Sequence, residues 1–229
     1  MAVFRSFKAL RPAADKARAV AALPYDVVNR EEARAIGEKN PLSFLHVDRP
    51  EMDLDPFIDL YDERVYAKAR ENLDNLEKEG ILVQDENPCY YIYEQVRKGR
   101  TQTGIVGCSS IDDYMNGVVK KHELTREDKE QDRIHHVDSC NANTGPIFLA
   151  CRYPQSLLEL MENWKKSHPA ACDFTEEDEI THRVWVIDDA EMIGKIHEEF
   201  AGIDSLYIAD GHHRAASAVK VGLKRREQN

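Results

Sequence analysis

The segment from residue 206 to residue 216 combines an apolar run, a glycine turn and an alanine-rich helix start. A helix start exposes unpaired backbone N–H groups and the positive end of the helix dipole, and both attract anions. Glycine lets the backbone approach a ligand closely, and imidazole or guanidinium groups add donors. We therefore predict a phosphate site made by Asp210, Gly211, His212, His213 and Arg214. The structural alternative is that Asp210 caps the helix and Arg214 is its ion-pair partner.

A second polar turn, residues 120–125, also follows a predicted strand and precedes a predicted helix. If the strands that begin at Val118 and Leu206 share a sheet, both turns could lie at the same end of it. A carboxylate beside a phosphate site is unfavourable unless it binds Mg²⁺ or accepts a proton from an attacking hydroxyl. We therefore predict catalytic roles for Glu123 and His122. The alternative is a first-turn glutamate favoured by the helix dipole.

Two further polar groups have simpler explanations. His135 and His136 are adjacent, so on a helix they point in different directions and cannot easily bind one metal ion. With Asp138 they indicate the end of a helix, followed by the polar loop 139–146. The tripeptide Pro24-Tyr25-Asp26, taken alone, reads as a turn.

The composition is typical of a globular protein of one or two domains: 229 residues, 42% of them hydrophobic and 32% charged. The formal net charge of −11 argues against nucleic acid as a partner, because neutralising phosphates requires an excess of Lys and Arg. No apolar run is long enough to cross a bilayer and residues 1–5 do not resemble a signal peptide, so we expect a cytoplasmic protein without a membrane partner. The five cysteines are widely spaced and form no C-x-x-C pair, which favours reduced thiols.

The first half of the chain predicts a mixture of strands and helices. Apolar runs indicate strands at residues 4–10 and 42–47, with a helix at 30–38 between them. The clearest helix spans 55–79, with Asp55 as its cap and Pro56 at its first position. Residues 89–111 read as a hairpin around the Lys98-Gly99 turn.

From about residue 116 strands and helices alternate, which favours βα units and a mixed or mostly parallel sheet. A helix is expected to begin at Thr125, which has the capping-box spacing to Asp128. Further strands are expected at 147–151, 184–187 and 206–209, and helices at 157–164, 191–200 and 215–223. The expected fold is α/β with mixed sheets (α+β), divided into regions 1–115 and 116–229. The last helix meets no further strand, which suggests a truncated piece of a longer protein.

The chain also carries five spaced motifs: Pro24-Tyr25-Asp26-Val27-Val28, His122-Glu123-Leu124-Thr125, Asp132-Arg133, Ala142-Asn143-Thr144-Gly145-Pro146 and Ile208-Ala209-Asp210-Gly211-His212-His213-Arg214. In this order they resemble the bacterial and archaeal family catalogued as domain of unknown function 1015, over essentially all 229 residues. Members of that family are longer, with a further C-terminal region. The resemblance also makes Tyr25, Asp26 and Asn143 candidate substrate-binding residues.

The second half is similar to the ParB/sulfiredoxin superfamily, and most closely to its free-serine kinases. In those kinases a similar Asp-Gly-x-His-Arg turn binds ADP or ATP phosphates, and a Glu after a His is the base toward the serine hydroxyl. The resemblance thus implies phosphate binding at residues 211–214 and a base at Glu123. Sulfiredoxin has a reactive Cys where this chain has His212, so sulfinic-acid reduction is not expected. The basic DNA-binding domain of ParB proteins is also absent.

These observations predict a phosphotransferase that uses ATP or ADP with Mg²⁺ and acts on a small hydroxylated metabolite. The family's association with serine-biosynthesis genes points to serine or phosphoserine as the substrate. A non-catalytic nucleotide-binding regulator is one alternative, and a homodimer is left open. Another alternative is a metal-dependent phosphatase that uses His122, Glu123 and Asp210 without a nucleotide.

Overall fold

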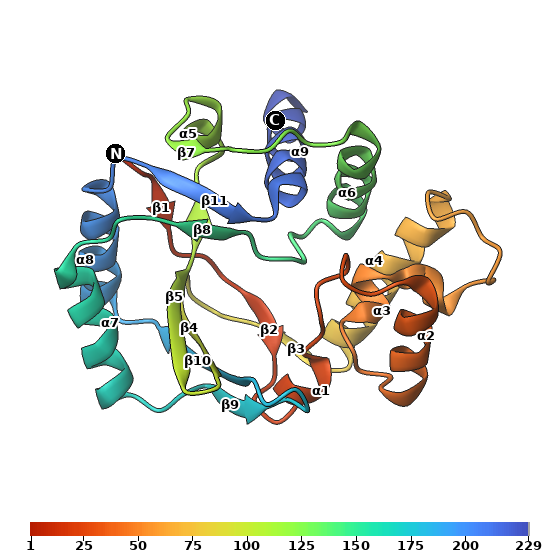
Figure 1. Cartoon of the computed structure of the whole chain (residues 1–229), viewed down its shortest axis with the longest axis horizontal. Helices are drawn as coiled ribbons and strands as arrows, with labels where there is room; N and C mark the ends of the chain where they lie inside the picture. Colours follow the sequence, from red (N-terminus) through yellow and green to blue (C-terminus); the bar gives the residue numbers. More distant parts are fainter. Residues whose placement is uncertain (229) are drawn as a thin grey trace. The chain divides into compact units, whose positions relative to one another are not determined.

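The computed structural model describes residues 1–228, which group into two compact units. Unit 1 contains Met1–Arg18, Val83–Lys120 and Ala150–Tyr207, and unit 2 contains Ala19–Leu82, Lys121–Leu149 and the chain from Ile208 onward. The continuous sequence regions 1–115 and 116–229 therefore each contribute to both units. Helices and several small sheets are combined, so the expected α/β (α+β) fold class is confirmed (Figure 1).

Unit 1 is built on a four-stranded antiparallel sheet with the order β5-β4-β10-β9. The strands are β4 (Tyr90–Arg97), β5 (Arg100–Val106), β9 (Cys172–Thr175) and β10 (Thr181–Ile187). Lys98 and Gly99 both have positive φ, at 49° and 76°, as a two-residue hairpin turn requires. The predicted hairpin is confirmed, and its strand β4 lies at the centre of this sheet.

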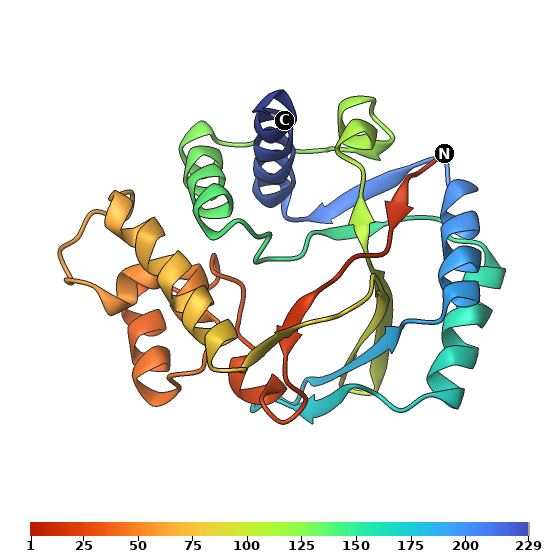
Figure 2. The ribbon, with the colours of Figure 1, turned by 180° about the vertical axis from the view of Figure 1, so that it is seen from behind.

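Two amphipathic helices of unit 1, α7 (Gln155–Ser167) and α8 (Ala190–Ala201), run beside each other in both ribbon views (Figures 1 and 2). They confirm the helices expected at 157–164 and 191–200. Each buries one apolar stripe: Leu157, Met161 and Trp164 in α7, and Met192, Ile196 and Phe200 in α8. Unit 1 also contains β1 (Phe4–Arg5), β2 (Leu10–Pro12), β6 (Cys108–Ser109) and α5 (Ile111–Met115).

The first segment of unit 2 is helical. It contains α2 (Arg30–Lys39), α3 (Leu45–Asp48), the 3-10 helix η1 (Pro50–Asp53) and α4 (Glu63–Lys78), while α1 (Ala17–Val20) and β3 (Leu82–Gln84) lie at its ends. Helix α2 confirms the helix expected at 30–38, and it begins with a capping box between Asn29 and Glu32.

Two predictions for this segment are wrong. Residues 42–47 are not a strand, because Leu45 and Val47 lie in the short helix α3, where both are buried. The long helix begins at Glu63, capped by Asp62, and not at Asp55. The Asp55 carboxylate instead accepts a hydrogen bond from the backbone N–H of Phe57, and so stabilises a local turn.

The rest of unit 2 is dominated by α6 (Glu127–Cys140) and α9 (His212–Gln228), which pack against each other. The predicted capping box at Thr125 is wrong: α6 begins after Arg126, without a side-chain cap. The Thr125 hydroxyl donates instead to the buried carboxylate of Glu130, at 2.6 Å. This bond fixes the loop that enters α6.

The remaining sheet has the order β7-β11-β8, formed by β7 (Val119–Lys120), β11 (Leu206–Asp210) and β8 (Phe148–Ala150). Strands β11 and β7 are parallel, with Leu206 opposite Val119 and Tyr207 opposite Lys120. The parallel pairing expected from the βα pattern is found here, whereas the larger sheet of unit 1 is antiparallel.

Two expected absences concern membranes and disulfides. Within residues 1–228, no helix combines the length and apolar character needed to cross a membrane. All five cysteines are free thiols, as predicted, and two of them, Cys89 and Cys140, are buried. Burial raises the pKa of the Cys140 thiol to about 12, so this thiol is unreactive near neutral pH.

Candidate functional site

The parallel pairing of β7 and β11 directs two polar turns to the same end of a sheet. Strand β7 ends at Lys120, just before His122 and Glu123, and β11 ends at Asp210, just before Gly211. Because the strands are parallel and in register, their carboxyl ends point the same way. The prediction that both turns lie at one end of a sheet is therefore confirmed.

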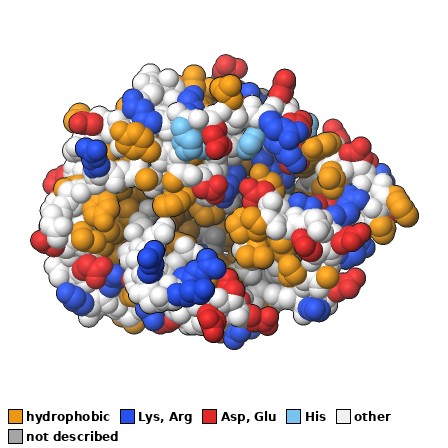
Figure 3. All heavy atoms as spheres, viewed as in Figure 1, with side chains coloured by type: hydrophobic (Ala, Val, Ile, Leu, Met, Phe, Trp, Pro, Cys, Tyr) orange, Lys and Arg blue, Asp and Glu red, His pale blue; other side chains and the backbone are white. Residues whose placement is uncertain are grey.

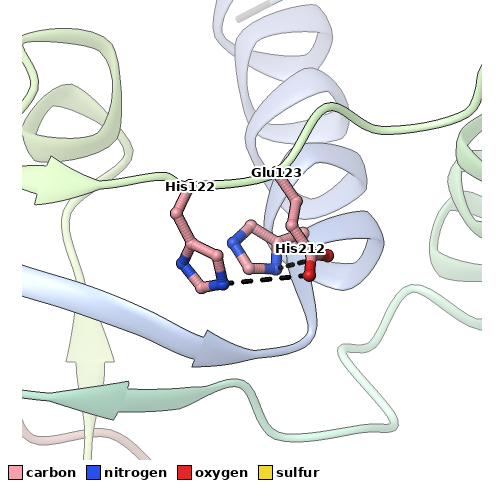
Figure 4. Close-up of side chains that lie close together, drawn as sticks. All are labelled: His122, Glu123 and His212. Atoms are coloured by element: carbon pink, nitrogen blue, oxygen red, sulfur yellow. Dashed lines mark ion pairs between the residues drawn. The ribbon is translucent and has the colours of Figure 1, made fainter.

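His122, Glu123 and His212 form a compact cluster within unit 2 (Figure 4). One Glu123 oxygen lies 3.5 Å from Nδ1 of His212, and the other lies 3.8 Å from Nε2 of His122. The two imidazole rings meet edge to face, with their centroids 4.5 Å apart. Both distances are longer than hydrogen bonds. The space-filling view shows histidine and acidic side chains side by side at the surface near the start of α9 (Figure 3).

Gly211 makes the turn that the sequence analysis predicted. Its φ is +90°, which L side chains rarely adopt, and its carbonyl accepts the first hydrogen bond of α9, from the N–H of Ala215. The backbone N–H groups of residues 212–214 therefore stand in the first turn, where a helix offers no internal acceptor. This arrangement can bind an anion, and Glu123 lies beside the first of these residues.

Arg214 is held in place by its own turn. Its guanidinium donates to Oδ2 of Asp210 at 2.6 Å and to the carbonyl of Pro146 at 2.5 Å. A Cβ on Gly211 or on Gly145 would come within 3.1 Å of the Arg214 side chain, which is tighter than most Cβ contacts, so Arg214 would have to shift. Asp210 and Arg214 thus form the ion pair of the structural alternative, but Gly211, not Asp210, occupies the capping position.

His213 has a partner outside the His122 cluster. Its Nε2 accepts a hydrogen bond from the backbone N–H of Arg126, at the start of α6. Within the predicted phosphate site, His213 therefore joins α9 to α6, and the donors that remain for an anion are mainly backbone groups and Arg214.

A narrow pocket in unit 2 brings several predicted residues together. Its lining consists of Tyr25, Asp48, Arg133, His136, Val137, Asn143, Thr144, Gly145, Ile147 and Arg214. Tyr25 and Asn143, predicted as substrate-binding residues, thus share a pocket with Arg214. Asp26 is exposed and does not line it.

Arg133, which stands in the sequence motif Asp132-Arg133, was not predicted as a site residue, but it is central to this pocket. Its guanidinium stacks over the Tyr25 ring at 4.3 Å and is paired with Asp132. The side chain is buried, which is unusual for an arginine without a structural or binding role. Burial raises the pKa of the Tyr25 phenol, against the opposing charge of Arg133, so Tyr25 is a neutral hydrogen-bonding group. Only its position in the motif Asp132-Arg133 could have pointed to Arg133.

The histidines of α6 have the structural roles that the sequence suggested. His136 is buried and donates from Nε2 to the carbonyl of Val47 at 2.8 Å, and His135 packs against Tyr66. Asp138 accepts hydrogen bonds from Lys224 and Arg225 of α9. None of these three residues belongs to the His122 cluster.

No curated protein and no solved structure matches this chain. One family model matches residues 4–229, which is nearly the full sequence, and its description is "Protein of unknown function (DUF1015)". The chain with the Gly211 turn and the His122 cluster therefore belongs to the DUF1015 family.

Proposed function

We propose that this protein transfers a phosphoryl group between a nucleotide and a small hydroxylated metabolite. One observation carries the proposal: the Glu123 carboxylate lies beside the start of α9, 3.5 Å from the imidazole of His212. A helix start that can bind phosphate and a carboxylate that can act on a hydroxyl are thus next to each other. Phosphoryl transfer depends mainly on such positioning and on charge neutralisation.

The nucleotide phosphates would bind at Gly211 and the first turn of α9. The positive φ of Gly211 leaves the backbone without a side chain at the turn, so an anion can approach the N–H groups of residues 212–214. Asp210 and Arg214 hold the turn in shape through their ion pair. ATP or ADP would bring Mg²⁺, which binds nucleotide phosphates readily because it prefers oxygen ligands.

Glu123 would act on the hydroxyl group of the acceptor. Its side chain is 63% exposed, and among residues 1–228 its polar contacts are those with His122 and His212, at 3.8 and 3.5 Å, so it can reach a ligand. In the proposal it takes the hydroxyl proton directly or through a bound cation. His122, which is also exposed at 59%, stands beside it as a second polar group.

The acceptor would be a small metabolite that also carries a charge. The pocket beside Arg214 is lined by the guanidinium groups of Arg133 and Arg214, each paired with an aspartate, and by the amide of Asn143, which can donate to an anionic group. Its volume of about 20 Å³ admits only a small group, so most of the metabolite would lie outside it. Similarity of the second half to free-serine kinases of the ParB/sulfiredoxin superfamily supports serine, or phosphoserine in the reverse direction.

The direct test incubates the purified chain with phosphoserine and Mg²⁺, with and without ADP, and measures ATP, serine and free phosphate. ATP formation that depends on ADP supports the proposal. Binding of ADP without any product would instead indicate a nucleotide-binding regulator, and the proposed transferase would be wrong.

A metal-dependent phosphatase is the second candidate, and the His122 cluster favours it. Two imidazoles and a carboxylate can hold a metal ion that activates water. Asp210, whose side chain is 67% exposed, would lie at the adjacent turn. In the same test, free phosphate released without ADP would support this candidate.

A further inference from the structure

The His122 cluster has a spacing that suits a metal site. Ligand atoms of His122, Glu123 and His212 all lie within 4.8 Å of one another, and two of the contacts measure 3.5 and 3.8 Å. Metal–ligand bonds of about 2.0–2.2 Å in a tetrahedral site put neighbouring ligand atoms about 3.3–3.5 Å apart. The observed contacts are close to this spacing and too long for hydrogen bonds.

His212 also has a buried ring nitrogen that an ion could pair with. His212 is only 7% exposed, and its Nε2 has no hydrogen-bond partner among the described residues. A buried imidazole nitrogen without a partner is costly in either tautomer, since it is an unpaired donor or an unpaired acceptor. His213, its neighbour in sequence, does have a backbone partner, the N–H of Arg126. The unpaired Nε2 is not the ring nitrogen near Glu123, since the 3.5 Å contact is made by Nδ1. The His212 ring as a whole lies beside His122 and Glu123 (Figure 4).

The other two side chains can adjust to an ion. His122 and Glu123 are 59% and 63% exposed, and they follow β7 in a loop that precedes α6. Side-chain rotation alone can therefore shorten the remaining distances, while His212 stays fixed on α9. A site with one buried and two exposed ligands also remains open to solvent on one side.

The ligand types decide which metal fits. Imidazole nitrogens suit Zn²⁺ and other late first-row ions, whereas Mg²⁺ prefers oxygen ligands and retains its waters. Two histidines and one glutamate are a known ligand set of catalytic zinc, in which a fourth position stays open. The protein's own ligands thus select against the Mg²⁺ that a nucleotide would bring.

We infer that His122, Glu123 and a ring nitrogen of His212 form a binding site for a divalent transition metal ion, with Zn²⁺ as the preferred ion and one position open for an anionic oxygen. The open position would lie next to the first turn of α9. If the proposed phosphoryl transfer is correct, the ion would polarise a phosphoryl or hydroxyl oxygen, and Glu123 would act as a ligand and not as a free base. That last step rests on the proposed function, whereas metal binding does not.

The test measures metal binding by the whole, untagged chain after treatment with a chelator. Titration with Co²⁺, which absorbs in the visible when four-coordinate, followed by displacement with Zn²⁺, should give a single site per chain. Calorimetry with Mg²⁺ under the same conditions should show much weaker binding. A charge-transfer band from cobalt to sulfur would instead show that the free cysteines bind the ion, and it would overturn the proposal.

Variants separate the three ligands from the rest of the chain. His122→Ala and Glu123→Gln should each weaken Zn²⁺ binding by at least about 10- to 100-fold, because even outer-shell partners of metal ligands contribute that much. Both residues are exposed, so these variants should fold; His212→Asn, at a buried position, is added only if its circular dichroism is unchanged. His135→Ala, an exposed histidine on α6 outside the cluster, is the matched control and should bind Zn²⁺ like the natural chain.

The outcomes distinguish this inference from the proposed function. Zn²⁺ affinity that is unchanged in both His122→Ala and Glu123→Gln, or absent from the natural chain, would show that there is no such site. The natural chain could bind Zn²⁺, and the cluster variants could fail to bind it, while no phosphoryl transfer is detected. This result would support the metal site and refute the proposed transferase function. Loss of turnover in Glu123→Gln with Zn²⁺ affinity retained would restore Glu123 as a base and refute its role as a ligand.

Discussion

The Glu123 carboxylate lies 3.5 Å from Nδ1 of His212, although the two residues are far apart in the sequence. The parallel pairing of β7 with β11 makes this contact, because each residue follows the carboxyl end of one of the two strands. A buried residue at the start of a helix and an exposed carboxylate on a loop are therefore combined in one site.

The first prediction concerns Glu123→Gln, which keeps the size of the side chain but removes its charge and basicity. Nucleotide affinity should change little, because the proposed phosphate donors are backbone groups of α9. If Glu123 is the base of the proposed transfer and not a metal ligand, turnover should fall by about two to four orders of magnitude, the usual scale for a lost general base. Initial rates and nucleotide titrations measure the two effects. Glu127→Gln, an exposed glutamate in the first turn of α6, should leave both unchanged, and full turnover in Glu123→Gln would exclude Glu123 from the mechanism.

The second prediction tests the backbone of the Gly211 turn. Gly211→Ala should destabilise the protein by about 1–3 kcal/mol, because φ is +90° and a Cβ would meet the Arg214 guanidinium at 3.1 Å. Urea denaturation measures the change. Gly194→Ala is the matched control: Gly194 lies within α8 with no atom near its missing Cβ, and alanine there should stabilise by about 0.5–1 kcal/mol. Equal effects of the two variants would contradict the strain at Gly211.

The third prediction concerns the loop that leads from the His122 cluster into α6. Buried Glu130 accepts the hydroxyl of Thr125 and pairs with Lys220 of α9. Burial alone would raise the pKa of Glu130, but these partners outweigh it and the pKa is lowered. Glu130→Ala should lower the free energy of unfolding by about 1–3 kcal/mol, since the Thr125 hydroxyl loses its acceptor. Thermal or urea unfolding measures the effect. The control is Glu127→Ala, at the exposed start of the same helix, which should change the free energy of unfolding by no more than about 0.5 kcal/mol.

The fourth prediction concerns pH and His136. Burial, together with the nearby charge of Arg133, lowers the pKa of His136 below its usual value. The unfolded chain then binds a proton near pH 6.5 that the folded chain does not, so folding stability should fall as the pH drops below about 6.5, by up to about 1.4 kcal/mol per pH unit. His136→Gln keeps an N–H donor for the carbonyl of Val47 and should flatten this part of the profile. Urea unfolding at pH 7.5 and 5.5 measures the difference.

For His46 we expect the opposite dependence of folding stability on pH. Its hydrogen bond to Asp53 raises the pKa of His46, against the effect of burial. Its stabilisation is therefore fully present below about pH 6.5 and is lost as the pH rises through the folded-state pKa. His46→Gln should lose more stability at pH 5.5 than at pH 8. The same pH trend in both variants would contradict the assigned environments.

The sequence correctly predicted those helices and turns that are specified by residues close together in the chain. The Lys98-Gly99 hairpin and the helices α7 and α8 follow from turn chemistry and apolar periodicity alone. Residues 42–47 were wrongly predicted as a strand, because a short apolar run has no period that distinguishes a buried helix from a strand. Thr125 was wrongly predicted as a helix cap, because the competing acceptor, Glu130, becomes available only when α6 has formed.

The same distinction applies to the site. The Gly211 turn was predictable, because a strand, a glycine and a helix follow one another in the sequence. The neighbouring position of the two polar turns was expected only on the condition that their strands pair. The partnership of His122 with His212, and the role of Arg133 under Tyr25, could not be predicted, because they depend on side-chain directions after distant segments have packed.

The division of each unit into three separated stretches of chain has a consequence for biosynthesis. All stretches of unit 1 have been translated once Tyr207 is added, whereas unit 2 still lacks β11's last residues and α9. In a nascent chain halted after Tyr207 the sequence of unit 1 is complete, but the Gly211 turn and His212 do not yet exist. The candidate site is thus among the last parts of these residues to form, and it can appear only after the loops that join the three stretches of unit 2 have closed.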